Sequence, residues 1–239
     1  MTIHLRLVSI FLRHSMGLGI GGVRTSLNAS LSAQWIGLVL NGLALSKDLL
    51  PKDLILSTVL WIETIVQVIQ LSFYTWFSYN FHTVVESTFL RYYDWVVTTP
   101  LMLFSTMIYY DYQNKPDETV TLESFLREHW WDVLVVFAFN MIMLVFGYFY
   151  ERGILDLLWS QVIGFAGFAG SFYVIWDRFA SKSPDNLWLY LFMVIVWGLY
   201  GVAAMFPTIP KNISYNLLDV VSKNFYGVFL SLLIVGKSV

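Results

Sequence analysis

The stretch Leu217-Leu218-Asp219-Val220-Val221-Ser222-Lys223 decides how this chain must fold. Lys223 lies near the middle of an apolar segment that runs from Ile213 to Val235, and a lysine at the mid-depth of a bilayer is costly. Asp219 lies four residues earlier, and therefore on the same face of a helix. A carboxylate one turn from an amine can hold a charged Schiff base in hydrocarbon. The alternative is a buried ion pair that only fixes how helices pack.

The composition predicts an integral, multi-pass membrane protein. Of the 239 residues, 57% are hydrophobic and only 13% are charged, too few to cover the surface of a soluble domain of this size. Cysteine is absent and the four histidines are scattered, so no disulfide framework and no metal site are expected. The net charge of −2 gives no indication of a nucleic-acid partner. We see no nucleophile–base pair and no nucleotide-binding loop, so the chain is not expected to be an enzyme.

Seven segments contain the roughly 20 apolar residues that a helix needs to cross about 30 Å of hydrocarbon. They are residues 27–46, 54–79, 89–110, 131–150, 153–177, 187–207 and 212–235. The sequence therefore predicts an all-α membrane protein, with one seven-helix domain over residues 26–237. Residues 1–25 form a separate N-terminal segment, whose apolar runs are interrupted by arginines. A short interfacial helix is the simplest interpretation of that segment.

The loop charges predict the orientation of the bundle. With the N-terminus outside, the inner loops and tail hold seven lysines and arginines, and the outer loops hold only Arg152 and Lys211. Positive residues accumulate on the cytoplasmic side of membrane proteins. We therefore expect an extracellular N-terminus and a cytoplasmic C-terminus.

The third segment opens with charged residues that share one helical face. In Leu90-Arg91-Tyr92-Tyr93-Asp94-Trp95-Val96-Val97-Thr98-Thr99-Pro100, Arg91, Asp94 and Thr98 have the spacing i, i+3 and i+7. Charges inside a membrane span must neutralise each other or a partner. Together with Asp219 and a protonated Lys223, the total charge is zero. This charge balance places the charged face of the third segment and the charged face of the seventh segment at a single site.

These motifs resemble those of the microbial (type 1) rhodopsins, with Arg-Tyr-x-Asp-Trp-x-x-Thr-Thr-Pro on the third helix and Asp-x-x-x-Lys on the seventh. The resemblance implies all-trans retinal bound to Lys223 as a protonated Schiff base. It implies that Asp94 and Asp219 are the counterions, with Asp94 as the proton acceptor and Arg91 beneath them toward the outside. Thr98 would hydrogen-bond to the acceptor.

The resemblance also implies which side chains surround the chromophore. Trp197 and Tyr200 match the family's Trp-x-x-Tyr on the sixth helix. The family has a proline after that tyrosine, whereas this chain has Gly201, and a further aromatic position near the ring is Ala204 here. The remaining pocket candidates are Trp95 and Thr99 on the third helix, with Asn140 and Met143 on the fourth.

The residue eleven positions after Asp94 bears on proton pumping. Eleven helical residues span about 16 Å and return to nearly the same face. In the family's outward proton pumps this position holds an acid, but here it is Ser105. A serine hydroxyl cannot donate a proton near neutral pH as a carboxylic acid can. A light-driven outward proton pump is therefore an alternative rather than the favoured function.

The first and second segments carry polar stripes. Glu63, Gln67, Gln70 and Tyr74 follow the spacing i, i+4, i+7 and i+11, and the stripe on the first segment consists of Ser30, Gln34, Gly37 and Asn41. Asn216 lies one turn before Asp219. Polar faces inside a membrane bundle face protein or water. They would either line a hydrated path with Glu63 as its gate, or form interhelical hydrogen bonds that stiffen the bundle.

A finer resemblance favours the hydrated path. Glu63-Thr64-x-Val66-Gln67, and the run from Lys211 to Asn216 that leads to Ser222–Gly227, are similar to the group 1 viral rhodopsins, which are light-gated cation channels. This implies a pore that carries monovalent cations or protons, with Glu63, Asn216 and Ser30 among its residues. Membrane lipid is the expected surrounding, and a homo-oligomer is left open. A sensory rhodopsin with a slow photocycle is the other alternative.

Overall fold

The computed structural model describes the backbone of residues 2–238 and the side chains of residues 19–238. Within this range the chain is all-helical, with helices α1 (Thr2–Leu45), α2 (Leu54–Tyr79), α3 (Phe81–Glu86), α4 (Tyr92–Asn114), α5 (Leu122–Glu151), α6 (Leu157–Arg178), α7 (Leu187–Ala204), α8 (Thr208–Asp219) and α9 (Phe225–Lys237). Short 3-10 turns cover Pro51–Asp53, Thr88–Arg91, Ala180–Lys182 and Pro184–Asn186, and a π-helical turn, Val220–Asn224, joins α8 to α9.

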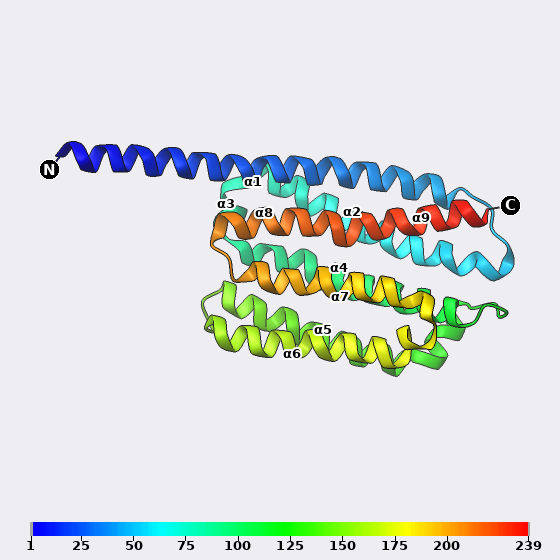
Figure 1. The fold of residues 1–239 in the computed structure, drawn as a ribbon. Coiled ribbons are helices and arrows are strands. Elements are labelled where there is room, and N and C mark those ends of the chain that lie inside the picture. Colours follow the sequence, from blue (N-terminus) through cyan, green and yellow to red (C-terminus); the bar gives the residue numbers. More distant parts are fainter. Residues whose placement is uncertain (1, 239) are drawn as a thin grey trace.

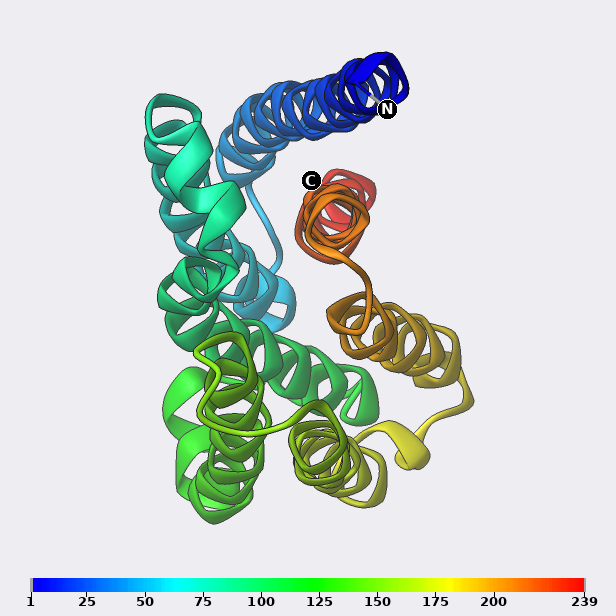
Figure 2. The same ribbon diagram turned by 90° about the vertical axis from the view of Figure 1, so that its left-hand side faces the viewer.

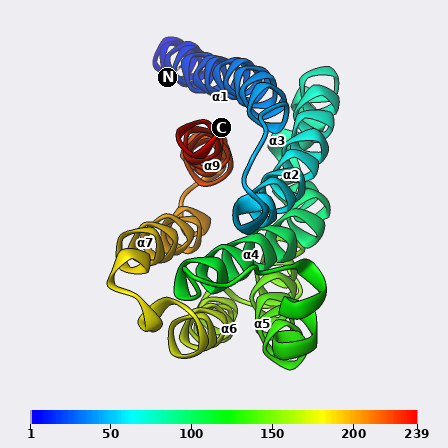
Figure 3. The same ribbon diagram turned by 90° about the vertical axis from the view of Figure 1, so that its right-hand side faces the viewer.

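The long helices lie side by side as rods, with α8, the π-helical turn and α9 forming one continuous rod (Figure 1). Viewed along their axes, the rods follow one another in chain order around a ring (Figures 2 and 3). The ring closes because α8 and α9 pack against α1, and α9 also contacts α2. The short helix α3 lies at one end of the bundle, which we call the α3 end. Leu45, Asn114 and Lys237 lie at the opposite end, which we call the C-terminal end.

The rods agree with the seven predicted segments. Helix α2 begins and ends at the predicted residues. The other boundaries shift by a few residues, except that α1 and α5 begin well before their predicted segments. Within the described part of the chain, five helical stretches are long and apolar enough to cross a membrane, namely Pro51–Tyr79, Leu122–Glu151, Leu157–Lys182, Pro184–Ala204 and Thr208–Lys237. The other two rods, α1 and α4, carry buried polar side chains on their inner faces.

The connection between the third and fourth predicted segments, residues 111–130, is shorter than expected. Helix α4 continues to Asn114, and α5 already begins at Leu122. The early start of α5 follows from a capping box: Thr121 Oγ1 accepts from the Ser124 backbone N–H at 3.1 Å, and Ser124 Oγ accepts from the Thr121 backbone N–H at 3.0 Å. These bonds satisfy two backbone donors at the helix start.

Helix α1 differs from the prediction for the N-terminal segment. We expected a short, separate interfacial helix within residues 1–25, but the helix runs unbroken from Thr2 to Leu45 and extends beyond the other rods (Figure 1). Its 44 residues correspond to about 66 Å at 1.5 Å per residue. The helix continues because residues 2–25 contain no proline, and glycine within a helix costs only about 1 kcal/mol.

The side chains on the outside of the rods suit a lipid environment. Large apolar residues are exposed on several rods, including Trp61, Leu134, Trp159, Ile195 and Leu232. Charged groups such as Arg91, Asp94 and Lys223 lie instead in the interior. This inverted distribution is the one that hydrocarbon requires.

Candidate functional site

Lys223 lies in the interior of the bundle against two carboxylates. Its Nζ is 2.8 Å from Asp94 Oδ2 on α4 and 3.4 Å from Asp219 Oδ1, at the end of α8. All three side chains are at most 2% exposed. The free amine stands where an imine nitrogen would lie in a Schiff base. Two carboxylates at these distances can hold a positive charge there in the absence of solvent.

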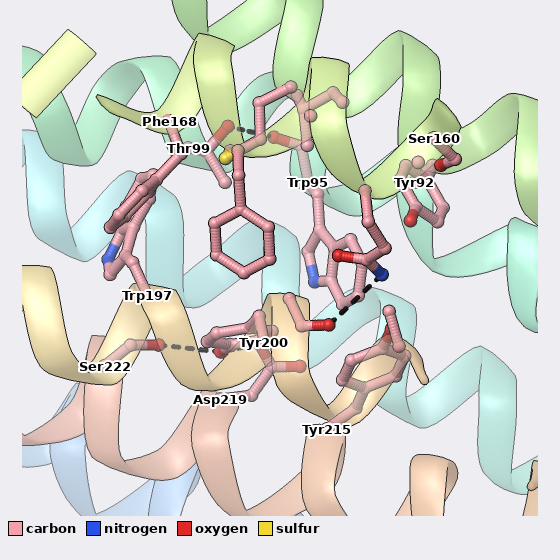
Figure 4. Close-up of a pocket in the computed structure, with 18 of the residues that line it drawn as sticks. Tyr92, Trp95, Thr99, Ser160, Phe168, Trp197, Tyr200, Tyr215, Asp219 and Ser222 are labelled. Atoms are coloured by element: carbon pink, nitrogen blue, oxygen red, sulfur yellow. Dashed lines mark hydrogen bonds between the residues drawn. The ribbon is translucent and has the colours of Figure 1, made fainter. Parts of the chain in front are cut away.

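Asp219 is fixed in place by two tyrosines. Tyr74 of α2 donates to its Oδ2 at 2.6 Å, and Tyr200 of α7 donates to its Oδ1 at 2.7 Å. The Tyr200 hydroxyl also lies 2.9 Å from Ser222 Oγ (Figure 4). These two hydrogen bonds give the Asp219 carboxyl group a defined orientation beside Lys223.

Arg91 completes the charge balance that the sequence predicts. It is fully buried, and its Nη1 lies 3.9 Å from Asp219 Oδ2. Its Nη2 donates to Asn216 Oδ1 at 2.6 Å and to Asn212 Oδ1 at 3.1 Å. The structure thus brings two cations and two anions together in one buried cluster. Asn216, predicted as a pore residue, is a direct partner of the arginine.

Thr98 makes a different hydrogen bond from the one that the resemblance implied. Its hydroxyl donates to the backbone carbonyl of Asp94 at 3.0 Å, and not to the carboxylate. A threonine inside a helix readily bonds to the carbonyl one turn earlier. Asp94 Oδ1 consequently has no hydrogen-bonding partner among the described residues.

A cavity of about 100 Å³ extends from Lys223 between α4, α5, α6 and α7. The predicted pocket residues Trp95, Thr99, Met143, Trp197 and Tyr200 all line it (Figure 4). Asn140 does not line it, but donates to Thr99 Oγ1 at 2.9 Å and so orients that side chain. An apolar, aromatic-lined cavity with an amine and a carboxylate pair at one side fits a polyene aldehyde.

The substitution of glycine for the family's proline is explained by a neighbouring aromatic ring. A Cβ atom on Gly201 would lie 2.5 Å from Cζ of Phe165 on α6. Phe165 and Phe168 both line the cavity. Sequence reasoning missed both phenylalanines, because only the packing of α6 against α7 brings them to the pocket. The space left by Gly201 is therefore taken by the ring of Phe165.

Ser105 and Glu63, which the sequence analysis treated separately, are partners. Ser105 Oγ donates to Glu63 Oε1 across the α2–α4 contact. Both side chains are fully buried, and Glu63 Oε2 has no hydrogen-bonding partner among the described residues. An acid therefore lies beside the position at which sequence reasoning found only a hydroxyl.

The remaining predicted pore residues lie in the interior between α1, α2 and the α8–α9 rod. We call the buried side chains of Ser30, Gln34, Asn41, Glu63, Gln67, Gln70 and Asn216 the polar row. Some members are paired: Ser30 donates to the Asn216 carbonyl at 2.7 Å, and Asn41 accepts from Ser231 at 3.0 Å. The three glutamine amides are buried, with no hydrogen-bonding partner among the described residues. Hydrogen bonds to other described residues therefore satisfy only some of the side chains in the polar row.

The fold and the site together define an integral, multi-pass membrane protein of the microbial rhodopsin class. The chain belongs to the family of bacteriorhodopsin-like proteins, whose sequence profile matches residues 28–236. Members of this family bind retinal as their chromophore. A comparison with curated protein sequences gives no match.

Solved rhodopsin structures share the fold over nearly the whole chain. The viral rhodopsin OLPVRII is 25% identical, with 90% of this chain and 98% of that chain covered at a TM-score of 0.76. The bromide-bound halorhodopsin from Halobacterium salinarum is 15% identical. The match covers 93% of this chain and 97% of that chain at a TM-score of 0.73. The rhodopsin from Exiguobacterium sibiricum is 18% identical. The match covers 92% of this chain and 99% of that chain at a TM-score of 0.69. The latter two are too distant in sequence to show more than the fold.

Proposed function

We propose that all-trans retinal binds in the cavity as a Schiff base with Lys223. When bound, it supplies light-driven isomerisation and a protonated nitrogen in the place of the lysine amine. Asp94 and Asp219, at 2.8 and 3.4 Å from that position, hold the positive charge. Arg91 balances the second carboxylate, so that the buried cluster remains neutral.

We propose further that the protein is a light-gated cation channel. The observation that carries this proposal is the polar row with its unpaired glutamine amides. A buried polar group without a partner costs about 1–3 kcal/mol. Water and cations along the row offset that cost, whereas a purely structural role predicts amides that pair with each other.

Asp94 and Asn216 connect the lysine to the polar row. Asp94 is the group placed to accept a proton from the nitrogen on Lys223. That transfer changes the charge opposite Arg91, whose Nη2 bonds Asn216 at 2.6 Å. Asn216 in turn is held by α1 through Ser26 Oγ at 2.9 Å. If the hydrogen bond between Arg91 and Asn216 weakens, Asn216 can move, and the path along the polar row opens to water at this point.

The orientation is part of the proposal. The lysines and arginines at the C-terminal end of the bundle outnumber those at the α3 end, leaving aside residues 1–25. The bias of positive residues toward the cytoplasm supports a cytoplasmic C-terminal end. The cavity and the polar row then lie between an extracellular α3 end and a cytoplasmic C-terminal end.

Glu63 is the acidic member of the polar row, and we expect Glu63→Gln to lower the photocurrent. A carboxylate about 4 Å from a cation contributes up to about 4 kcal/mol at an effective dielectric constant of about 20. A loss of about 1.4 kcal/mol, roughly a third of that energy, already lowers the current about tenfold. Whole-cell photocurrents, normalised to the visible absorption of the protein, measure the effect. Glu118→Gln, in the exposed inner loop, is the matched control. Equal currents and selectivity in both variants would remove Glu63 from the pore.

The current–voltage relation under illumination tests the channel itself. Cells that express the protein with retinal are clamped over a range of voltages, with different cation gradients. A channel gives a current that reverses near the equilibrium potential of the permeant cation. A current that stays outward at all voltages identifies a pump, and no current at all leaves the sensory alternative.

An outward proton pump is the second candidate, supported by the contact between Glu63 and Ser105. In the outward proton pumps of the microbial rhodopsin family, an acid occupies the position of Ser105. Glu63 brings a carboxyl group from α2 to the same place, where it can return a proton toward Lys223. Under this alternative, Glu63→Gln slows recovery of the photocycle rather than changing ion selectivity.

A further inference from the structure

Side-chain amides crowd two glycines at the contact between α1, α2 and the α8–α9 rod. A methyl group placed on Gly37 of α1 would lie 2.8 Å from Asn224 Nδ2 and 2.9 Å from Gln67 Nε2. A methyl group on Gly227 of α9 would lie 2.9 Å from Gln67 Nε2 and 3.3 Å from the amide of Asn41. The Gln67 amide therefore lies between the two glycines. Glycine at both positions leaves the room that it occupies.

Three amide oxygens near this contact, those of Gln67, Gln34 and Asn224, accept no hydrogen bond from the described residues. Neither amide atom of Gln67 has a hydrogen-bonding partner among residues 19–238, and the same is true of Gln34 and of Asn224 Oδ1. These side chains are at most 4% exposed. Each such group costs about 1–3 kcal/mol if it stays unpaired. The unpartnered oxygens can bind a ligand that is itself positive, and the unpartnered nitrogens of Gln67 and Gln34 can donate to water.

We propose that Gln67, which lies between Gly37 and Gly227, and Asn224, which lies against Gly37, form a binding site for a partly dehydrated monovalent cation, together with Gln34 one helical turn before Gly37 on α1. The site rests on the proposed channel function and identifies where along the path the cation dwells. Amide oxygens can replace part of a cation's hydration shell.

The charge of the surroundings selects the valence. Gln67 and its neighbours are neutral, and the carboxylate of Glu63 lies one helical turn before Gln67 on α2. One of its oxygens already accepts from Ser105. Divalent cations such as Ca²⁺ usually take several carboxylates and six to eight oxygen ligands, which this cluster does not offer. Neutral amide oxygens with one acidic side chain nearby suit a monovalent cation better than a divalent one.

The site is connected to the lysine by the backbone. Asn224 directly follows Lys223 within the π-helical turn Val220–Asn224. Its Nδ2 donates to the Ala33 carbonyl of α1 at 3.1 Å, so its oxygen is oriented between the rods. A π-helical turn is a local irregularity that is often found at functional sites. A displacement of Lys223 along this turn changes the position of one ligand of the site.

Cation exchange in the dark tests the site independently of any current. The retinal-bound protein in lipid nanodiscs is perfused alternately with KCl and N-methyl-D-glucamine chloride at equal ionic strength, and infrared difference spectra record the side-chain amide carbonyl bands. We expect a K⁺-dependent shift of these bands in the wild type. In Gly37→Ala the half-saturating K⁺ concentration should rise about tenfold or more, equivalent to about 1.4 kcal/mol. Gly42→Ala, at a helix position with no neighbouring atom within 4 Å, is the matched control and should match the wild type.

The outcomes separate this site from the channel. A K⁺-dependent band that is weakened in Gly37→Ala, kept in Gly42→Ala and absent in Gln67→Leu supports the site, even if no photocurrent is found. If Gly37→Ala does not assemble a pigment, Gln67→Leu alone decides. Spectra of the wild type that do not respond to K⁺, or that respond equally to Ca²⁺, overturn the proposal.

Discussion

Replacing Lys223 with alanine should abolish the visible absorption of the reconstituted protein and its photocurrent. The Nζ atom of Lys223 lies within 3.4 Å of two buried carboxylates, and Lys223 lines the aromatic cavity. Without it, no covalent bond to an aldehyde can form at this position. The measurement is the absorption spectrum after addition of all-trans retinal to purified protein.

A matched variant separates loss of the bond from loss of the fold. Lys52→Ala removes an exposed lysine at the C-terminal end of the bundle and should keep the full visible band. Circular dichroism of Lys223→Ala reports whether the helices remain. A retained visible band in Lys223→Ala would show that the chromophore binds elsewhere.

Replacing Asp219 with alanine should be among the most destabilising single changes in this chain. The carboxylate accepts hydrogen bonds from Tyr74 and Tyr200 and lies within 4.0 Å of Lys223 and Arg91. Removing it leaves buried positive charge without compensation, which costs about 3–5 kcal/mol. Unfolding in mixed detergent micelles, followed by circular dichroism, gives the change in the free energy of unfolding.

The control for this change is Asp177→Ala. Asp177 is 56% exposed at the end of α6, so its loss should change the free energy of unfolding by no more than about 0.5 kcal/mol. If the two variants were equally stable, the buried cluster would contribute nothing measurable to the fold.

The charged part of the site could be predicted from the sequence, because charge in a membrane segment is costly and helical spacing is regular. Asp219 and Lys223 are one turn apart on one rod, and Arg91 and Asp94 are likewise close on another. Their total charge of zero was enough to place them together. The bounds of α2 followed from the length of its apolar segment, whereas α1 and α5 begin well before the segments predicted for them.

Contacts between rods were harder to predict, because they depend on how the helices rotate about their axes. Tyr74 was found as part of a polar stripe, but its partner Asp219 lies 145 positions away. The pairing of Glu63 with Ser105 was missed for the same reason. The π-helical turn around Lys223 leaves no distinct pattern in the residues, yet it sets where Asn224 points.

The covalent bond to Lys223 is the claim on which the other proposals rest, and locating it tests them most directly. The retinal-bound protein is reduced with borohydride, digested, and its peptides are weighed by mass spectrometry. We expect a retinyl group on the peptide that contains Lys223 and on no other. An adduct on a different lysine, or none in a protein that is visibly coloured, would contradict the account.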